Sequence, residues 1–405
     1  MKSIIKSKVT YGMNLYGSKE INAVKNSLKK TTLMGKNVSE FEKRVSEKFG
    51  KKIGVMTNSG SSSNLLTLAA LNFKKGSNII TPILTFSTTV APMVQLGLVP
   101  NFVDVNMETL NINENLIEKA INKKTVALMI PNLIGNLPMQ DKLRKIANKY
   151  KIIYIEDSAD TIGATYNKKS TGYYADVSTT SFYGSHVISC AGNGGMICLS
   201  NKKLAEKITL LRSWGRSSSL YKDSEKIENR FNIKIENIPY DKKFVFSEIG
   251  YNLEPSEIGA AFGLNQIKNL NRFLRIRVNN FKSHQKFFSK FKNLFYLPQQ
   301  PKKAYTGWLA YPLIIKENKY FTRNEIQIYL EKNNIQTRPI FTGNILKQPG
   351  FKRINYIKGS KSFKNANYIM KNGFMFGLHQ GLDKNKIKYI HKKFLDFIKI
   401  KKIFN

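Results

Sequence analysis

One histidine, His186, closes a segment of small and aromatic residues (181–186, SFYGSH), and a glycine-rich turn follows at 192–195 (GNGG). An imidazole can take up and return a proton near neutral pH, because the reference pKa of histidine is about 6.5. Unlike the amine of a lysine, it cannot bind a carbonyl compound as a Schiff base. A single histidine is more often packed or solvated than catalytic, so its role depends on the motifs that accompany it.

Two further groups of residues have types and spacing suited to chemistry. Residues 58–62 (NSGSS) lie between an expected strand and an expected helix. Backbone N–H groups and hydroxyls there can hold a phosphate, although such a turn more often only caps its helix. Residues 155–160 (IEDSAD) place carboxylates at the end of a buried strand. Such carboxylates are often merely solvated, but one of them can also keep the ring nitrogen of a pyridine cofactor protonated.

The elements that must position these residues alternate along the first 270 residues. Short segments rich in β-branched residues alternate with amphipathic segments, and this pattern predicts a largely parallel sheet covered by helices on both faces. Ligands of such sheets bind beyond the carboxyl ends of the strands. Ser39 and Glu42 predict a capping box that begins a helix. The expected strands are 53–57, 78–81, 99–105, 126–130 and 152–156, and the expected helices include 114–121 and 141–150.

The pattern changes at about residue 270, where a long basic helix is expected over 272–290. We therefore expect an α/β protein with a large, mainly parallel sheet domain (residues 1–270) and a smaller α+β C-terminal domain (residues 271–405). The polar segment 217–241 is expected to form a long surface loop. The later expected elements are a strand at 308–315, a helix at 323–333 and a final basic helix from Asp383.

Composition narrows the classes of function. The chain has 405 residues, with 66 Lys+Arg against 27 Asp+Glu and a formal net charge of +39. Because the lysines are spread over nearly every expected element, we expect no nucleic-acid partner, while the positive field favours an anionic substrate. No secretory signal and no run of about 18 apolar residues is apparent, so a cytoplasmic protein without a membrane partner is expected. His284 and His391 lie on basic helices and are expected to be solvated.

In this order and spacing, the three groups resemble those of the sugar aminotransferase-like family of fold type I pyridoxal phosphate enzymes. The resemblance extends over nearly the whole chain, from residues 17–20 (GSKE) and 34–36 (MGK) to the final helix. It implies pyridoxal 5'-phosphate / pyridoxamine 5'-phosphate as the cofactor and a homodimer with sites at the subunit interface. The residues it implies for the cofactor are Gly60, Ser61 and Ser181 at the phosphate, Phe86 on the ring, Asp157 at the ring nitrogen, and Asn252 at the phosphate of the partner subunit.

The lysine that binds the cofactor in most of this family is replaced here by His186. This resembles the nucleotide-sugar 3-dehydratases, which have histidine at that position. Segments 338–344 (RPIFTGN) and 372–380 (NGFMFGLHQ) are typical of these dehydratases. Asp160, where aminotransferases usually have glutamine, is a further expected cofactor-binding residue. The candidates for substrate binding are Arg212, Arg216, Arg338 and His379. For Arg212 and Arg216 a role at the surface is an equal alternative. For His379 a position outside the substrate pocket is an equal alternative.

Two kinds of 3-dehydratase bear on this chain. One kind carries an iron–sulfur cluster and receives electrons from a reductase, whereas the other has no cluster and acts on GDP-4-keto-6-deoxymannose. The cluster type has cysteines after its Trp-Gly-Arg, but residues 214–219 read WGRSSS here. The two cysteines, Cys190 and Cys198, are too few for a four-thiolate site. We therefore expect the cluster-free chemistry and no metal.

The resemblance implies a reaction in which glutamate donates an amino group to a noncovalently bound cofactor. His186 then moves the proton at C4′ of the cofactor while the C3 hydroxyl of a nucleotide-linked 4-keto-6-deoxyhexose leaves. The nucleotide and the stereochemistry of the sugar stay open. So do three other functions: a nucleotide-sugar aminotransferase without a lysine, a reductase-coupled iron–sulfur dehydrase, and a catalytically silent paralogue that only binds a nucleotide sugar.

Overall fold

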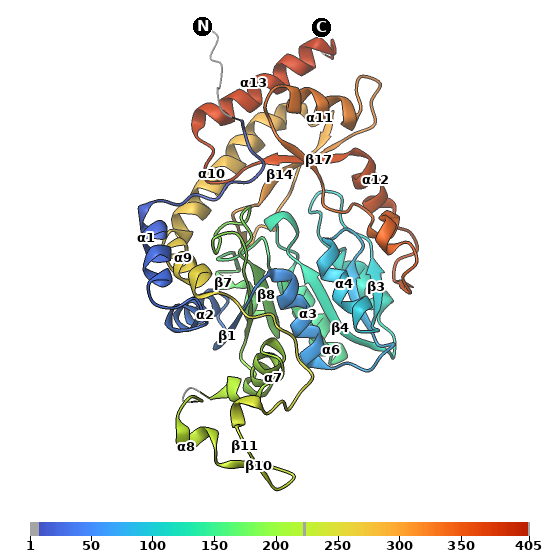
Figure 1. Ribbon diagram of the computed structural model, residues 1–405. Coiled ribbons are helices and arrows are strands. Elements are labelled where there is room, and N and C mark those ends of the chain that lie inside the picture. Colours follow the sequence, from blue (N-terminus) through green and yellow to red (C-terminus); the bar gives the residue numbers. More distant parts are fainter. Residues whose placement is uncertain (1–7, 222–223, 404–405) are drawn as a thin grey trace.

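The computed structural model describes residues 8–221 and 224–403. Residues 1–7, on which part of the secretory-signal argument depends, lie outside the described residues. Two sheets organise the molecule, a large one in the lower half of Figure 1 and a small one in the upper half. None of the described helices is both long and apolar enough to cross a membrane.

The large sheet is mainly parallel, as the alternating pattern predicts. Within the described residues it has the strand order β1-β9-β8-β5-β4-β2-β3-β16, and only β9 runs antiparallel to its neighbours. Most of its positions are buried, because helices cover both faces. The strands are β1 (Ile53–Thr57), β2 (Asn78–Pro82), β3 (Val99–Val103), β4 (Thr125–Pro131), β5 (Ile153–Asp157), β8 (Val177–Ser181), β9 (Gly195–Leu199) and β16 (Ile357–Lys358).

Two predicted helices, at 114–121 and 141–150, are found to within one residue. Helices cover the large sheet on both faces. They are α1 (Ser18–Leu28), α2 (Lys36–Lys48), α3 (Gly60–Leu71), α4 (Ser87–Gln95), α5 (Glu114–Ala120), α6 (Gln140–Tyr150), α7 (Lys202–Arg212) and α9 (Glu257–Lys268). A short three-stranded sheet at the side of this layer comprises β13 (Ala304–Tyr305), β6 (Thr165–Tyr166) and β7 (Lys169–Ser170).

The predicted capping box of α2 is wrong. The helix begins at Lys36, so Ser39 lies one turn inside it, and the N-cap residue is Gly35. The free N–H groups of the first turn are bound by a distant carboxylate, since Glu257 accepts hydrogen bonds from Gly35, Asn37 and Val38 at 2.7–3.1 Å. A long-range partner thus replaces the local cap that the sequence pattern indicates.

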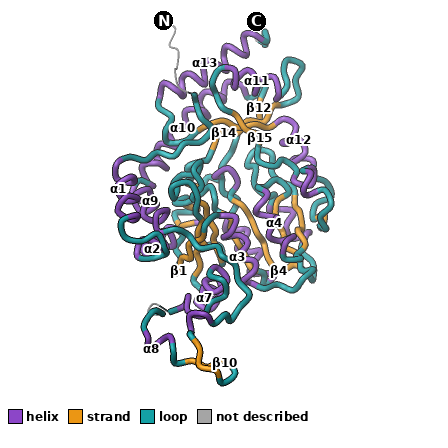
Figure 2. The backbone as a smooth tube through the Cα atoms, in the orientation of Figure 1, coloured by secondary structure: helices purple, strands orange, loops and turns teal. Residues whose placement is uncertain are grey.

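The small sheet is antiparallel in the order β12-β14-β17-β15. Figure 2 shows helices on the side of this sheet that faces away from the large one. The core between them is rich in aromatic rings, among them Phe288, Tyr311 and Phe394. The elements are α10 (Leu270–Phe288), β12 (Phe295–Tyr296), β14 (Ala310–Ile315), α11 (Arg323–Lys332), β15 (Thr337–Pro339), α12 (Lys364–Asn372), β17 (Gly373–Gly377) and α13 (Lys384–Ile400).

The two sheets do not correspond to two continuous halves of the chain. Val9, near the amino terminus, pairs in parallel with Ile335 beside the small sheet. Conversely, β16 from the later part of the chain joins the large sheet next to β3. A domain boundary at residue 270 therefore stays a prediction, although α10 does begin at Leu270.

His284 is buried and His391 is partly buried, whereas both were expected to be solvated. His284 is fully buried on the face of α10 that also buries Arg277, Phe281 and Phe288. Its Nδ1 lies 3.0 Å from Nε2 of His391, whose ring stacks on an aromatic ring of α10. The spacing of 277, 281, 284 and 288 is that of a buried helical face, which the many basic residues of α10 obscured in the sequence.

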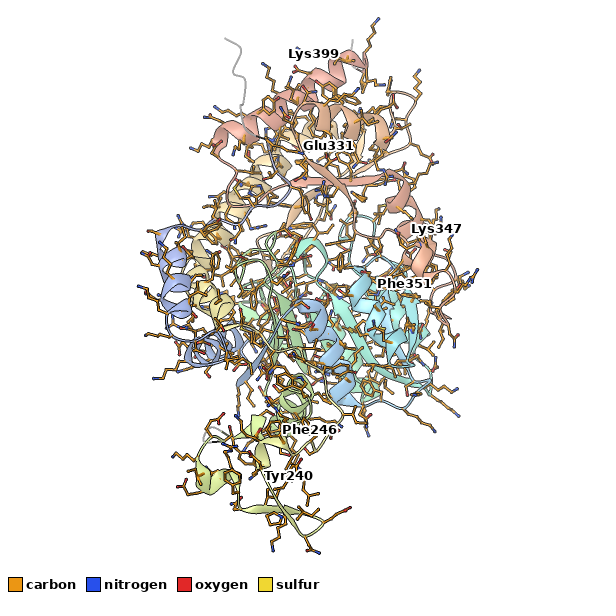
Figure 3. All side chains as sticks on the ribbon, in the orientation of Figure 1. Tyr240, Phe246, Glu331, Lys347, Phe351 and Lys399 are labelled. Atoms are coloured by element: carbon orange, nitrogen blue, oxygen red, sulfur yellow. The ribbon has the colours of Figure 1, made fainter. Side chains whose placement is uncertain are left out.

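The predicted surface loop at 217–241 contains secondary structure. Its described residues include the short helix α8 (Ile227–Arg230) and an antiparallel hairpin, β10 (Ile233–Ile235) with β11 (Ile238–Tyr240). We call residues 217–221 and 224–250 the projecting segment, because they extend from the body at the bottom of Figure 1. Figure 3 labels Tyr240 and Phe246 on it. Its exposed apolar side chains include Ile227, Phe231, Ile238, Phe244, Phe246 and Ile249.

Candidate active site

A cavity of about 690 Å³ lies beyond the carboxyl ends of β4, β5 and β8. Residues of the small sheet, such as Arg338 and Met375, complete its lining. The described residues contribute no lysine to this lining. The predicted site residues that the structure brings together here are Gly60, Ser61, Phe86, Asp157, Asp160, Ser181, His186 and Arg338.

One end of the cavity combines the first turn of α3 with the end of β8. Ser59 is the N-cap of α3, and its hydroxyl accepts a hydrogen bond from the N–H of Ser62 at 3.1 Å. Gly60 packs so closely on Ser181 that an added Cβ would lie 2.6 Å from the Cβ of that serine. Hydroxyls and a helix N-terminus without a carboxylate form a site suited to a phosphate.

Asp157 ends β5 and is held rigidly in the cavity lining. Its Oδ2 accepts hydrogen bonds from Asn64 Nδ2 at 2.9 Å and Thr89 Oγ1 at 2.8 Å. Burial raises the pKa of Asp157, and the hydrogen bonds from Asn64 and Thr89 oppose that rise. Phe86, which is 50% exposed and contacts Phe341 edge-on, offers an aromatic surface to the same cavity.

His186 lies in the loop between β8 and β9, where its N–H bonds the carbonyl oxygen of Tyr183 at 2.9 Å. Its Nδ1 lies 3.2 Å from Oδ1 of Asp160, at ion-pair distance but without the direction of a hydrogen bond. Oδ2 of Asp160 accepts a hydrogen bond from the N–H of Ile134 at 3.1 Å. The loop thus brings an imidazole and a fixed carboxylate together in the cavity.

Tyr11 also lines the cavity, and sequence reasoning missed it. The guanidinium carbon of Arg338 lies 5.7 Å from the centre of the Tyr11 ring. No local motif points to this tyrosine, because long-range contacts bring it to the site, among them the pairing of Val9 with Ile335 and the hydrogen bond from the Tyr11 N–H to Gln336. The position of Tyr11 at the cavity therefore depends on tertiary structure and not on a local sequence motif.

Four predicted residues lie outside the lining of this cavity: Arg212, Arg216, Asn252 and His379. Arg212 is buried, and its Nη1 donates to Glu42 at 2.9 Å and to the carbonyl oxygen of Met56 at 2.8 Å. Glu42 and Met56 thus hold the guanidinium away from the cavity. Arg216 places its guanidinium carbon 4.4 Å from the centre of the Trp214 ring, and Asn252 is exposed next to the projecting segment.

His379 is fully buried, and its ring binds the amino-terminal segment at Thr10 rather than a substrate. Its Nδ1 accepts a hydrogen bond from the N–H of Gly381 at 3.2 Å, so the ring proton is on Nε2, which donates to the carbonyl oxygen of Thr10 at 3.0 Å. Burial, with a contribution from Arg277, lowers the pKa of His379 to about 3. The ring is therefore neutral at physiological pH and fastens the amino-terminal segment.

The two cysteines lie apart from the polar cavity lining. Cys190 and Cys198 are buried free thiols, and burial raises the pKa of both. In residues 8–221 and 224–403, no group of three or more His, Cys, Asp and Glu side chains is placed to hold a metal ion.

Residues 15–395 match the model of the DegT/DnrJ/EryC1/StrS aminotransferase family. The chain belongs to this family. It is 34% identical to the lipopolysaccharide biosynthesis protein RfbH of Salmonella typhimurium, over 94% of this chain and 90% of that protein. It is also 34% identical to GDP-4-keto-6-deoxy-D-mannose 3-dehydratase of Escherichia coli O55:H7, over 86% and 89% of the two chains. A crystal structure of GDP-4-keto-6-deoxymannose-3-dehydratase with a trapped PLP-glutamate geminal diamine superposes with a TM-score of 0.84 at 31% identity, covering 95% and 99%.

Membership in this family, and the likeness in fold to a solved enzyme at 31% identity, confirm the fold type I architecture expected from the sequence. The family includes aminotransferases by name, and the two similar relatives include a sugar 3-dehydratase. The class of reaction in this chain therefore depends on the residues of its own cavity.

Proposed function

We propose that this protein is a pyridoxal-phosphate-dependent nucleotide-sugar 3-dehydratase. Its substrate would be GDP-4-keto-6-deoxymannose or a related nucleotide-linked 4-keto-6-deoxyhexose, with glutamate as the amino donor. The observation that carries the proposal is His186, which faces the cavity from the loop after β8 while the described lining contains no lysine. The other residues expected around the cofactor, apart from Asn252, line the same cavity.

The cavity fits pyridoxal phosphate. The first turn of α3 and Ser181 would hold the phosphate, and the close packing of Gly60 on Ser181 leaves this end of the cavity free of larger side chains. Asp157 would hold the ring nitrogen, and Phe86 would contact the ring face. When bound, the cofactor supplies an electron-accepting ring and, in its pyridoxamine form, the amine that joins it to the sugar.

His186 would act as the proton carrier of the reaction. A proton held on Nδ1, on the side of Asp160, leaves the lone pair of Nε2 free to accept the proton at C4′. The same nitrogen would then return a proton to the C3 oxygen as it leaves. A lysine at this position would compete by binding the cofactor covalently, which favours transamination over deoxygenation.

We also propose that the protein acts as a homodimer. The projecting segment exposes many apolar side chains, and exposed apolar surfaces of this kind mark interaction sites. Asn252 and Arg216 lie beside this segment and outside the cavity of their own chain, so they would serve the site of the partner subunit. Size-exclusion chromatography with light scattering tests the dimer.

The decisive experiment is product analysis with the purified protein, pyridoxal phosphate, glutamate and GDP-4-keto-6-deoxymannose. We expect a 3-deoxy-4-keto sugar, with 2-oxoglutarate and ammonia released in equal amounts. A stable 4-amino sugar would identify an aminotransferase, and turnover only after a reductase is added would identify the electron-transfer route. Failure to bind any form of vitamin B6 would indicate a silent paralogue, and a thermal-shift panel of nucleotide sugars would identify the preferred carrier.

A further inference from the structure

The amino-terminal residues 8–15, which we call the strap, run between the small sheet and the loop that carries His186. Val9 forms two backbone hydrogen bonds beside the small sheet, one to the carbonyl oxygen of Asn334 at 2.8 Å and one from the N–H of Gln336 at 2.9 Å. The side chain of the same glutamine accepts a hydrogen bond from the N–H of Tyr11 at 2.8 Å. The strap is therefore fixed to the small sheet at Val9 and Tyr11, and His379, just after β17, binds Thr10 between them.

The other end of the strap packs directly on the loop of His186. Gly12 lies so close to this loop that an added Cβ would be 2.7 Å from the Cβ of Ser185. Asn14 donates a hydrogen bond to the hydroxyl of Ser189 in the same loop. Tyr11 thus has a fixed position between the small sheet and the proton carrier of the site, and it lines the cavity there.

The hydroxyl of Tyr11 has no strong partner within the described residues. Its single hydrogen bond is a contact of 3.9 Å to the Sδ atom of Met375, and a thioether sulfur is a weak acceptor. Burial and the negative charge of Asp160 raise the pKa of the phenol, so it stays protonated at neutral pH. A donor that lines a cavity and has no good acceptor of its own is available to a bound ligand.

The position of Tyr11 favours the sugar over the cofactor as that ligand. Tyr11, Arg338 and Met375 lie in the part of the lining that belongs to the small sheet and the strap. The expected phosphate and ring positions, at Ser181 and Asp157, belong to the large sheet. A substrate bound on the cofactor would therefore have Tyr11 on its other side, near His186.

We propose that Tyr11 is a further catalytic residue, whose hydroxyl donates a hydrogen bond to the C3 oxygen of the sugar as that oxygen leaves. The inference rests on the proposed function and deepens it. As the C3–O bond breaks, negative charge grows on the oxygen, so the hydrogen bond is stronger in the transition state than in the bound substrate. His186 still supplies the proton that completes the departing water, and Tyr11 keeps its own proton.

The test separates the two halves of the reaction in the Tyr11→Phe variant of the full-length protein. The first half, conversion of bound pyridoxal phosphate to the pyridoxamine form by glutamate, is followed by absorbance and involves no sugar. We expect the rate of this first half-reaction, and the affinity for the cofactor, to stay within about 2-fold of the wild-type values. The reason is that the Tyr11 hydroxyl is proposed to bind the sugar and not the cofactor or glutamate. We expect kcat for dehydration of GDP-4-keto-6-deoxymannose to fall about 100-fold with little change in KM, as for loss of one donor to a developing oxyanion.

Tyr16→Phe is the matched control, because Tyr16 follows the strap, is 60% exposed and packs its ring on Phe262 away from the cavity. It should leave both half-reactions unchanged. An undiminished dehydration rate in Tyr11→Phe, a rise in KM alone, or an equal loss in both half-reactions would each overturn the role of Tyr11. Wild-type protein that formed only a 4-amino sugar would overturn the proposed function, and with it the leaving oxygen that Tyr11 is proposed to bind.

Discussion

The Nδ1 atom of His186 lies 3.2 Å from Oδ1 of Asp160, and the side chains are only 14% and 8% exposed. The carboxylate cannot turn away freely, because its other oxygen is bound by the N–H of Ile134. A fixed anion beside one ring nitrogen favours a proton on that nitrogen and leaves the other as the base. We infer that the pair favours the tautomer of His186 in which Nε2 is free to act as the base.

The first prediction is that Asp160→Asn lowers kcat for dehydration by about 100-fold, since the variant removes the charge that selects the tautomer. Asp157 is intact in this variant, so the dissociation constant of pyridoxal phosphate should change less than about 3-fold. Steady-state kinetics and a cofactor titration measure the two effects. If turnover persisted while cofactor binding weakened strongly, Asp160 would be a cofactor ligand and not a positioning residue.

The second prediction concerns the covalent state of the cofactor. Borohydride reduction of the wild-type protein with pyridoxal phosphate, followed by intact mass measurement, should give no phosphopyridoxyl adduct at the active site, because the described lining contains no lysine. His186→Lys should give the adduct and suppress dehydration, since the base has become the point of attachment. His186→Asn should bind the cofactor without an adduct and without turnover; near-normal turnover would mean that another group is the base.

The third prediction is that Gly60→Ala weakens the binding of pyridoxal phosphate at least about 10-fold, because backbone or side chains at the phosphate end must shift. The added Cβ would lie 2.6 Å from the Cβ of Ser181, a residue of the same phosphate end. Gly17→Ala is the control, since no atom lies within 4 Å of its added Cβ. Fluorescence or absorbance titration measures the affinity, and equal affinities for the two variants would argue against this phosphate site.

The parts of the site that the sequence predicted are those fixed by local structure. Asp157 follows a predicted strand and Gly60 lies in a predicted strand-to-helix turn, so the alternating pattern places both at one edge of the sheet. The strand that ends at Ser181 was not predicted, and only the family resemblance indicated that residue. Tyr11 could not be predicted in this way, because a long-range pairing of the strap brings it to the cavity. Similarly, Glu257 caps α2 from a distant part of the chain, and no spacing within α2 reveals it.

The histidine pair between α10 and α13, in which His284 is buried and His391 partly buried, leads to a prediction about acid stability. Burial lowers the pKa of His391 to about 4, and burial and the neighbouring His391 lower the pKa of His284. In the unfolded chain both rings have a pKa near 6.5. Above pH ~6.5 both states are neutral, whereas below it the unfolded state binds protons and the folded state does not, so stability falls as the pH falls from ~6.5 towards ~4.

We expect the histidine pair to lower the wild-type free energy of unfolding by about 1–2 kcal/mol between pH 7.5 and 5.5, a figure reduced for the partial exposure of His391. The buried His379 adds a separate contribution of the same sign, which the variants below retain. The double variant His284→Phe, His391→Phe removes both hydrogen-bond partners and keeps two rings in an aromatic core, so it should fold and lose most of this dependence. His391→Phe alone should be less stable at both pH values, because it leaves the buried Nδ1 of His284 unpaired. Urea unfolding at the two pH values measures the effect, and an unchanged pH dependence in the double variant would assign the acid sensitivity to other groups.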